Sequence, residues 1–244
     1  MNRLNEHGQP IGPAVADWVG AQHPGHVGME GRYCRVEPLN ADKHTADLFA
    51  AYSHDKTGAL WTYNFIGPFE TESALRDWVQ KASGVDDQPY FAIIDRTTDR
   101  AVGIASYLRI APVAGSIEVG GITYSPLLQR QRAATETMYL MMARVFNELG
   151  YRRYEWKCDA LNAPSCGAAR RMGFTPEGIF RQAATYKGRN RDTAWFSLLN
   201  YEWPPVERAF TRWLAEGNFD AGGQQRQKLN DLIVQERAEL TDAG

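Results

Sequence analysis

The sequence predicts one mixed α+β domain, with an N-terminal arm and a C-terminal helical tail. Two observations lead to this prediction. Short alternating segments typical of strands recur between residues 32 and 124, with helical segments between the early ones. A strongly periodic helix then lies between two further strands, which gives the order β-α-β-α-β-β. The length of 244 residues, 43% of them hydrophobic, suits one medium domain with extensions.

The arm is predicted over residues 1–30, which are rich in Gly, Pro and His, show no sustained period and are expected to lie on the surface. The domain is predicted over residues 31–204 and begins with an alternating strand at 32–37. Asn40 can cap a helix over 41–54.

An aromatic loop containing Gly67-Pro68 follows this helix. A second helix is predicted over 71–83, with Leu75, Trp78 and Val79 facing inward. Strands are predicted at 90–95 and 101–110, joined by a turn at 97–99.

Another strand is predicted at 116–124, and the strongest helix spans 131–149. Its apolar residues recur at helical spacing, and Gly150 stands where a helix commonly ends. This helix should connect two parallel strands through a right-handed crossover. The remaining predicted elements are a strand at 151–159, a helix at 163–172 and strands at 174–183 and 193–200 with a hairpin tip at 187–192.

The tail, residues 205–244, is predicted to form two helices separated by Gly222-Gly223. These helices could pack on the same chain or form a homodimer.

Composition disfavours several classes of function. The net charge of −2 argues against nucleic acid as the main partner. No apolar run is long enough for a bilayer, and the N-terminus lacks the apolar region of a secretory signal. The three cysteines lack metal-ligand spacing, so we expect reduced thiols, a cytoplasmic location and no metal. All five histidines precede residue 117, which disfavours a Ser-His or Cys-His nucleophile in the later half.

Residues 129–135 form a candidate phosphate site. They begin a helix just after a strand, where unpaired N–H groups and the helix dipole favour an anion. Arg130 and Arg132 add charge, and Thr135 adds a hydroxyl. A plain turn with solvated arginines explains the same residues, so the turn alone does not identify a ligand.

Two ordered motifs add to this pattern, and through them residues 117–174 resemble the GNAT superfamily of acyl-CoA-dependent N-acetyltransferases, particularly its RimJ/RimL-like branch. That family carries Q/R-x-x-G-x-G/A at this turn. Gln129 matches its first position and Ala134 its last, whereas Arg132 replaces the middle glycine. The family's N-x-x-S…(L/M)-G-F motif is matched by Asn162, Ser165, Met172, Gly173 and Phe174.

The resemblance implies a GNAT-like, mostly antiparallel sheet in which the parallel strands 117–124 and 151–159 splay apart, with flanking helices. It also implies acetyl-CoA, or another acyl-CoA, as the co-substrate, with its pantetheine arm in the gap. The implied contacts are Gln129, Arg130, Gln131, Arg132, Ala133, Ala134 and Thr135 at the pyrophosphate, with Ile122, Thr123, Tyr124, Asn162 and Ser165 along the arm. Ser165 could instead only start the following helix.

Two backbone features of this site can be tested against a structure. A backbone N–H near Ile122 or Thr123 would polarise the acyl carbonyl, and the adjacent Gly120-Gly121 suits a bulge. The glycine-free turn remains competent if Arg132 is helical and its side chain points to solvent or phosphate. If that side chain fills the turn, the acyltransferase hypothesis fails.

Acyl transfer needs a neutral amine, whereas lysine amines (pKa about 10.4) and α-amines (pKa about 8) are mostly protonated at pH 7. Glu118 is the first candidate for the general base, because RimL-like sequences carry E-(I/V)-G at this position. A solvent-facing strand carboxylate is the alternative explanation. Asp159 is the second candidate base.

The proton donor to the leaving thiolate is not evident. The family's tyrosine position holds Ala169, and Tyr124 or Tyr139 could substitute, although both suit packing. Cys166 has no activating histidine or lysine nearby in sequence, so direct transfer is favoured over an acyl-enzyme.

The candidate residues of the amine pocket are Trp61, Tyr63 and Trp156, and Phe65 is a further candidate. The alternative explanation is that these aromatic residues only close the core under a loop. Basic residues at 187–191 could attract an acidic substrate or the 3′-phosphate of the coenzyme, or could simply be solvated.

We therefore predict an N-acyltransferase acting on a primary amine of a small molecule or protein N-terminus. The alternative is a non-catalytic acyl-CoA-binding or interaction protein. A Rossmann-type oxidoreductase is disfavoured, because G-x-G-x-x-G is absent.

Overall fold

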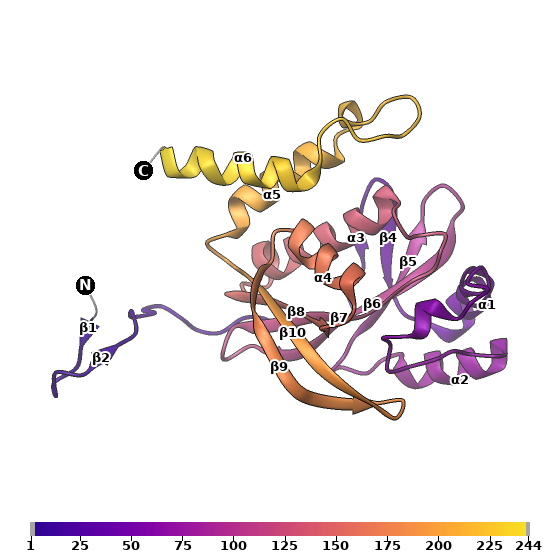
Figure 1. Ribbon diagram of the computed structural model, residues 1–244, viewed down its shortest axis with the longest axis horizontal. Coiled ribbons are helices and arrows are strands. Elements are labelled where there is room, and N and C mark those ends of the chain that lie inside the picture. The colour runs from indigo at the N-terminus through magenta and orange to yellow at the C-terminus, as the bar shows by residue number, and fades with distance from the viewer. Residues whose placement is uncertain (1–2, 243–244) are drawn as a thin grey trace.

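The computed structural model describes residues 3–242, with side chains as far as residue 239. An eight-stranded sheet in the order β3-β4-β5-β6-β7-β8-β10-β9 forms the domain (Figure 1). Its strands are β3 Met29–Glu30, β4 Cys34–Pro38, β5 Tyr90–Asp95, β6 Arg100–Ala111, β7 Ser116–Tyr124, β8 Arg153–Asp159, β9 Thr175–Tyr186 and β10 Arg189–Leu199. Neighbours are antiparallel except β7 and β8, which confirms the predicted mixed sheet.

The parallel pair β7 and β8 separates halfway along its length. Residues 116–119 pair with residues 153–156, and no pairing follows although β7 continues to Tyr124 and β8 to Asp159. The edges of the two strands beyond that point are therefore available to a chain-like ligand, as the predicted splay required.

Helices cover both faces of the sheet. Helices α1 (Ala41–Tyr52) and α2 (Glu72–Ala82) pack on one face of β5 and β6 through a cluster that includes Leu48, Val79 and Ile104. Helices α3 (Arg132–Ala143), α4 (Ala163–Arg171) and α5 (Trp203–Leu214) share the larger core on the opposite face. The predicted cap of α1 is confirmed, since the Asn40 side chain accepts from the Lys43 backbone N–H.

Two predicted boundaries differ from the structure. The helix predicted over 131–149 is α-helical to Ala143 and continues as a π-helical turn, η2 (Arg144–Glu148). The strand predicted at 193–200 begins earlier, at Arg189. Its turn is confined to Lys187 and Gly188, with φ values of +49° and +70°. Such a two-residue turn matches the twist of the strands and lets them pair up to the tip.

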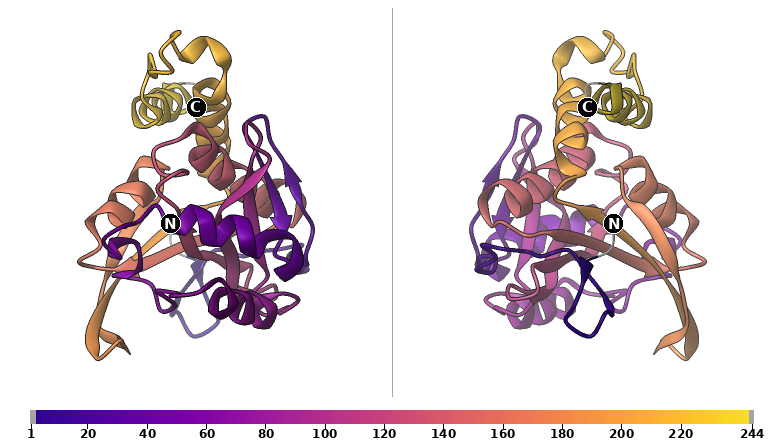
Figure 2. Two further views of the ribbon diagram at one scale, coloured as in Figure 1. Left: turned by 90° about the vertical axis from the view of Figure 1, so that its right-hand side faces the viewer. Right: turned by 90° about the vertical axis from the view of Figure 1, so that its left-hand side faces the viewer.

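The arm and the tail lie apart. In the arm, β1 (Arg3–Leu4) and β2 (Pro10–Ile11) form a hairpin that projects away from the domain, so only the later part of the arm follows its surface (Figure 1). The tail comprises α5, the 3₁₀ turn η3 (Glu216–Asn218) and α6 (Leu229–Asp242), and it stands on the α3 side of the domain (Figure 2). Tyr139 of α3 stacks on Phe210 of α5 with 5.6 Å between ring centroids.

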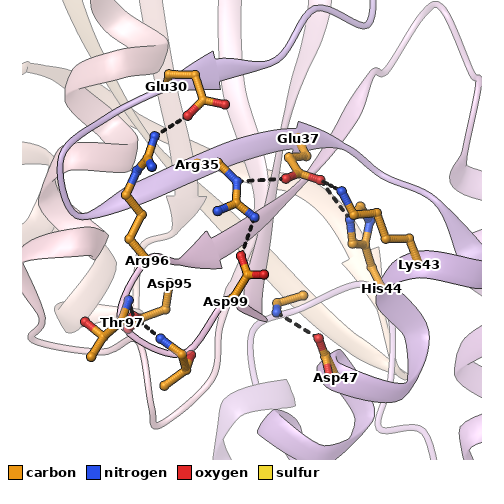
Figure 3. Close-up of polar contacts among 12 residues, drawn as sticks. Glu30, Arg35, Glu37, Lys43, His44, Asp47, Asp95, Arg96, Thr97 and Asp99 are labelled. Atoms are coloured by element: carbon orange, nitrogen blue, oxygen red, sulfur yellow. Dashed lines mark hydrogen bonds and ion pairs between the residues drawn. The ribbon is translucent and has the colours of Figure 1, made fainter.

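A charged network ties α1 to the outer strands (Figure 3). Glu37 of β4 accepts from Arg35, Lys43 and His44. His44 is buried, and its Nδ1 accepts from the Asn40 backbone N–H at 3.1 Å. Burial lowers the pKa of His44, in keeping with a neutral ring that donates only through Nε2.

Candidate active site

The turn between β7 and α3 stands at the open end of the β7–β8 gap. The backbone N–H groups of Leu128 and Gln129 donate to the Ser125 carbonyl, and Arg130 takes the left-handed conformation with φ +64°. Helix α3 then begins at Arg132. The N–H groups of its first turn lack intrahelical acceptors and point out of the helix end, so the residues present fit a pyrophosphate.

Arg132 occupies the position where the family pattern has glycine. Its backbone is helical, and the left-handed residue of the turn is Arg130 instead. The Arg132 guanidinium lies 3.7 Å from the centroid of the Phe219 ring, in the tail, and 5.6 Å from that of Tyr33. The side chain therefore leaves the turn open and is held by the tail.

The other turn residues divide between packing and exposure. Ala133, Ala134 and Thr135 are buried, whereas Gln131 is exposed. The Gln129 side chain donates to the Tyr124 carbonyl at 2.9 Å, which caps the end of β7. The Thr135 hydroxyl accepts from Arg171 at 3.1 Å, so Arg171 brings a cation to the first turn of α3. Sequence reasoning missed Arg171, because it lies on α4 and is distant in sequence.

Strand geometry distinguishes the two candidate N–H groups for the acyl carbonyl. The Ser125 backbone N–H donates to the Val102 carbonyl of β6, and Thr123 pairs with Ile104 of the same strand. Backbone groups alternate in direction along a strand, so the N–H of Ile122 points into the gap and that of Thr123 toward β6.

The predicted bulge is present just before Ile122. The β6–β7 register shifts here, and Gly121 has φ +57°. A Cβ on Gly121 would stand 2.7 Å from a ring carbon of Tyr90 and 2.8 Å from the Ser106 hydroxyl. Only glycine satisfies both the backbone conformation and this close approach.

Glu118 lies on the sheet face opposite α3 and α4, and its side chain is only 3% exposed. Its Oε2 accepts from Arg109 at 2.7 Å and lies 2.9 Å from the Lys157 Nζ. Its Oε1 lies 3.5 Å from the point where a Cβ on Gly120 would stand, beside the bulge, and a methyl carbon of Leu108 lies 2.7 Å from the same point. Burial raises the pKa of Glu118, against the opposing effects of Lys157 and Arg109.

Asp159 ends β8 on the same face as Lys157 and Glu118. One carboxylate oxygen accepts the Leu161 backbone N–H at 2.8 Å, and the other accepts the Tyr186 hydroxyl at 2.7 Å. Tyr186 comes from the end of β9 and is buried. Sequence reasoning missed this tyrosine, because only the sheet order brings the ends of β8 and β9 together.

Asn162 and Ser165 lie at the start of α4. The Asn162 side chain accepts the Ser165 backbone N–H at 3.2 Å and caps the helix. Trp156, an expected amine-pocket residue, lies in the core on the α4 side and donates to the Ser165 hydroxyl at 3.0 Å. It faces away from Glu118 because strand residues alternate. Cys166 is buried beside Cys158, with 3.5 Å between the sulfur atoms.

The aromatic loop after α1 contacts the β9–β10 hairpin. Trp61 is buried against Tyr52, whereas the Tyr63 hydroxyl donates to the Leu161 carbonyl at 3.1 Å. Lys187 donates to the Trp61 carbonyl at 2.8 Å, and Arg189 also donates to this loop. The loop and the hairpin tip therefore close one side of the face that carries Asp159.

Neither alternative proton donor points at the gap. The Tyr124 hydroxyl donates to the Ala134 carbonyl of α3 at 3.3 Å, and Tyr139 is stacked against α5. Ala169 is buried in the core. In the part of the chain that the structure describes, no helix is long and apolar enough to cross a membrane, and no cluster of acidic, His and Cys side chains suits a metal.

Comparison with known proteins gives one consistent result. The model of the acetyltransferase (GNAT) domain family matches residues 35–175. An uncharacterised N-acetyltransferase, p20 of Bacillus licheniformis, is 29% identical over 183 residues, which cover 72% of this chain and 99% of p20. A GCN5-related N-acetyltransferase structure from Brucella melitensis has a TM-score of 0.88 and 46% identity, covering 90% of this chain and all of its own. A probable GNAT acetyltransferase structure from Chromobacterium violaceum has a TM-score of 0.73 and 39% identity, over 80% of this chain and 97% of its own.

Proposed function

Because this chain belongs to the GNAT acetyltransferase family, we propose that it transfers an acetyl group from acetyl-CoA to a primary amine, directly and without an acyl-enzyme. The observation that carries the proposal is the end of β7–β8 pairing at Val119 and Trp156, next to the open helix end at Arg132. Together they supply two unpaired strand edges for an extended chain and N–H groups for a diphosphate.

Glu118 is the proposed general base. Its free Oε1 stands beside the bulge that presents the Ile122 N–H, so a proton acceptor and an oxyanion donor lie close along β7. Burial raises the pKa of the Glu118 carboxyl, which makes its ionised form a stronger base toward an ammonium. Asp159 is the second candidate, with Tyr186 fixing its orientation.

The leaving group needs no dedicated acid in this proposal. Acetyl-CoA supplies a thioester whose thiol has a pKa of about 8.5, so thiolate departure is tolerable and water can protonate it. This is consistent with the buried Ala169 and with the Tyr124 and Tyr139 side chains, which pack against α3 and α5 rather than point at the gap.

The acceptor is proposed to be a small-molecule amine or a protein N-terminus. The RimL ribosomal L7/L12 α-N-protein acetyltransferase has a TM-score of 0.61 to this chain but 18% identity, so that likeness extends to the fold alone. The RimJ/RimL-like branch therefore remains part of the proposal.

Two measurements test the function separately. Calorimetry with coenzyme A tests binding, and we expect Gln131→Glu to weaken it strongly by placing an anion at the exposed N-terminal end of α3. Arg152→Gln is the control, since Arg152 lies near the other end of that helix, against Trp18. Thiol release from acetyl-CoA with an amine panel tests turnover. Absence of coenzyme A binding would refute the proposal, and binding without turnover of any amine or peptide would favour the non-catalytic alternative.

A further inference from the structure

Arg191 is a buried cation that lacks an anion. It lies on β10 near the hairpin tip and is only 9% exposed. Among residues 3–239 no carboxylate forms an ion pair with it, and its Nε has no hydrogen-bond partner. Such a group is expensive to bury and calls for a physical explanation.

Two other buried cations have a carboxylate beside them. The Lys157 side chain is 5% exposed and pairs with Glu118 and Glu155 at 2.9 and 2.7 Å. Arg144 donates to two arm carbonyls at 2.7 and 2.6 Å, and its Nε, which also lacks a hydrogen bond, lies 3.9 Å from a carboxylate oxygen of Glu148. Arg191 differs from both, so its isolation is not a general property of how this fold buries charge.

Arg191 stands beside the end of β8, on the strand that pairs with β8 on the side away from β7. The neighbouring Asp192 carbonyl accepts the Ala160 backbone N–H at 2.8 Å, which places Arg191 just beyond the end of β8. Its guanidinium carbon lies 4.9 Å from the centroid of the Phe65 ring. Phe65 in turn lies 5.2 Å from the ring of Tyr186, which donates to Asp159. Arg191 therefore belongs to the corner that holds the second candidate base.

The charged groups around this corner do not pair with Arg191 in the described part of the chain. Both Asp159 oxygens are engaged, by Tyr186 and by the Leu161 N–H, and neither lies within ion-pair distance of Arg191. The nearby Lys187 and Arg189 are also cations, and both donate to carbonyls of the loop that contains Phe65. The corner is thus positively charged on the hairpin side.

Phe65 compensates only part of the cost of burying Arg191. A cation–π contact contributes about 0.5–2 kcal/mol, which is less than the cost of an unpaired buried charge. A ring against one face of a guanidinium also leaves its in-plane N–H groups free, in the geometry that binds a carboxylate through two parallel hydrogen bonds.

We propose that Arg191 binds a carboxylate carried by one of the two substrates, which makes this a carboxylate-selective acyltransferase. This inference rests on the proposed acyl-transfer function. The carboxylate has two possible sources, the acceptor amine, as in an amino acid, or the far end of a dicarboxylic acyl group. The chemistry at Arg191 is the same in both cases.

The experiment has one arm for each source. In the first, acetyl-CoA is the donor, and each amino acid of a panel is compared with its carboxamide. In the second, one neutral amine is the acceptor, and succinyl-CoA is compared with acetyl-CoA. We expect the carboxylate to raise kcat/KM at least tenfold in one arm. Arg191→Gln should remove that preference, and Arg191→Lys should restore part of it.

Arg181→Gln is the matched control, because Arg181 is an exposed arginine on the same hairpin. It should keep the wild-type preference. Arg191→Gln should also keep or raise the melting temperature, since it removes an unpaired buried charge.

Calorimetry compares the same probes by their Kd values. The amino acids and their carboxamides are titrated into the coenzyme A-loaded protein, and succinyl-CoA is titrated into the free protein. It applies even when turnover is slow. Equal Kd and kcat/KM for wild type and Arg191→Gln, with every carboxylate probe, would overturn the inference. Coenzyme A binding and acetylation of uncharged amines would then still support the proposed function, so the two failures are distinguishable.

Discussion

Replacing Glu118 by glutamine tests the proposed base with little change in shape. The variant loses the Oε2 contacts to Arg109 and Lys157 at 2.7 and 2.9 Å. Lys157 keeps Glu155 at 2.7 Å, and the Arg109 side chain is 58% exposed, so water can solvate it. We therefore expect a stability loss of about 1–3 kcal/mol, below the roughly 3–5 kcal/mol expected when a buried charge loses its only partner.

The effect of Glu118→Gln on activity should be much larger. A positioned general base contributes about 10²–10⁴-fold, so kcat/KM should fall by that factor. Because burial raises the pKa of Glu118 above its ordinary 4.5, kcat/KM of the wild type should rise with pH through that higher pKa. This limb of the pH profile should vanish in the variant.

Thiol release from acetyl-CoA across pH, with calorimetric melting, measures both effects. Glu155→Gln is the control, because it also removes one carboxylate from Lys157 but lies on β8, opposite Glu118, and not on the bulged strand β7. It should lose stability and keep most activity. Activity of Glu118→Gln within threefold of the wild type, or an equal loss in Glu155→Gln, would refute the assignment of Glu118.

Three further predictions concern stability. Glu136→Gln should cost about 3 kcal/mol in chemical denaturation, because the buried carboxylate accepts three consecutive backbone N–H groups at the start of β4, at 2.6–2.8 Å; a loss under about 1 kcal/mol would contradict this account. In acid, stability should start to fall below the ordinary histidine pKa of 6.5, because burial lowers the pKa of His44 and only the unfolded chain gains the proton. It should fall further between pH 4.5 and about 2, because hydrogen bonds to Glu37 outweigh its burial and lower its pKa from 4.5 to about 2 (Figure 3); a flat melting temperature from pH 7 to 4.5 would rule out the His44 effect, and a flat one below pH 4.5 the Glu37 effect. Gly121→Ala should lower the melting temperature, because of its φ of +57° and the contact at 2.7 Å, whereas Gly167→Ala, which meets nothing within 4 Å, should not; equal effects would exclude strain at the bulge.

Sequence reasoning succeeded where the deciding interactions are local. Asn40 caps a helix that begins at the next residue, as predicted, because a cap needs only an N–H two or three positions onward. The Gly120-Gly121 pair predicted a bulge for a similar reason, since backbone conformation depends on the residue itself. The two ordered motifs, separated by a periodic helix and a strand, predicted the fold that the family match confirms.

Tertiary structure decided the questions that depend on distant partners. Whether Arg132 fills the turn is settled by Phe219 of the tail, which no local pattern relates to it. The two cations that pair with Glu118 come from β6 and β8, and the tyrosine that donates to Asp159, Tyr186, comes from β9. The periodicity of a sequence shows which residues face the core. The partner of a buried charge depends on strand order and register, which are determined by contacts between residues that are far apart in the sequence.

The sequence by itself therefore determined the fold class, the positions of its main helices and strands, and the family resemblance that points to acyl transfer. Only the folded chain showed that Arg191 is buried without a carboxylate from residues 3–239 beside it, whereas Lys157 on the neighbouring strand has two. The physical reason is that the cost of burying a charge depends on what surrounds it in space, and a sequence lists neighbours along one dimension only.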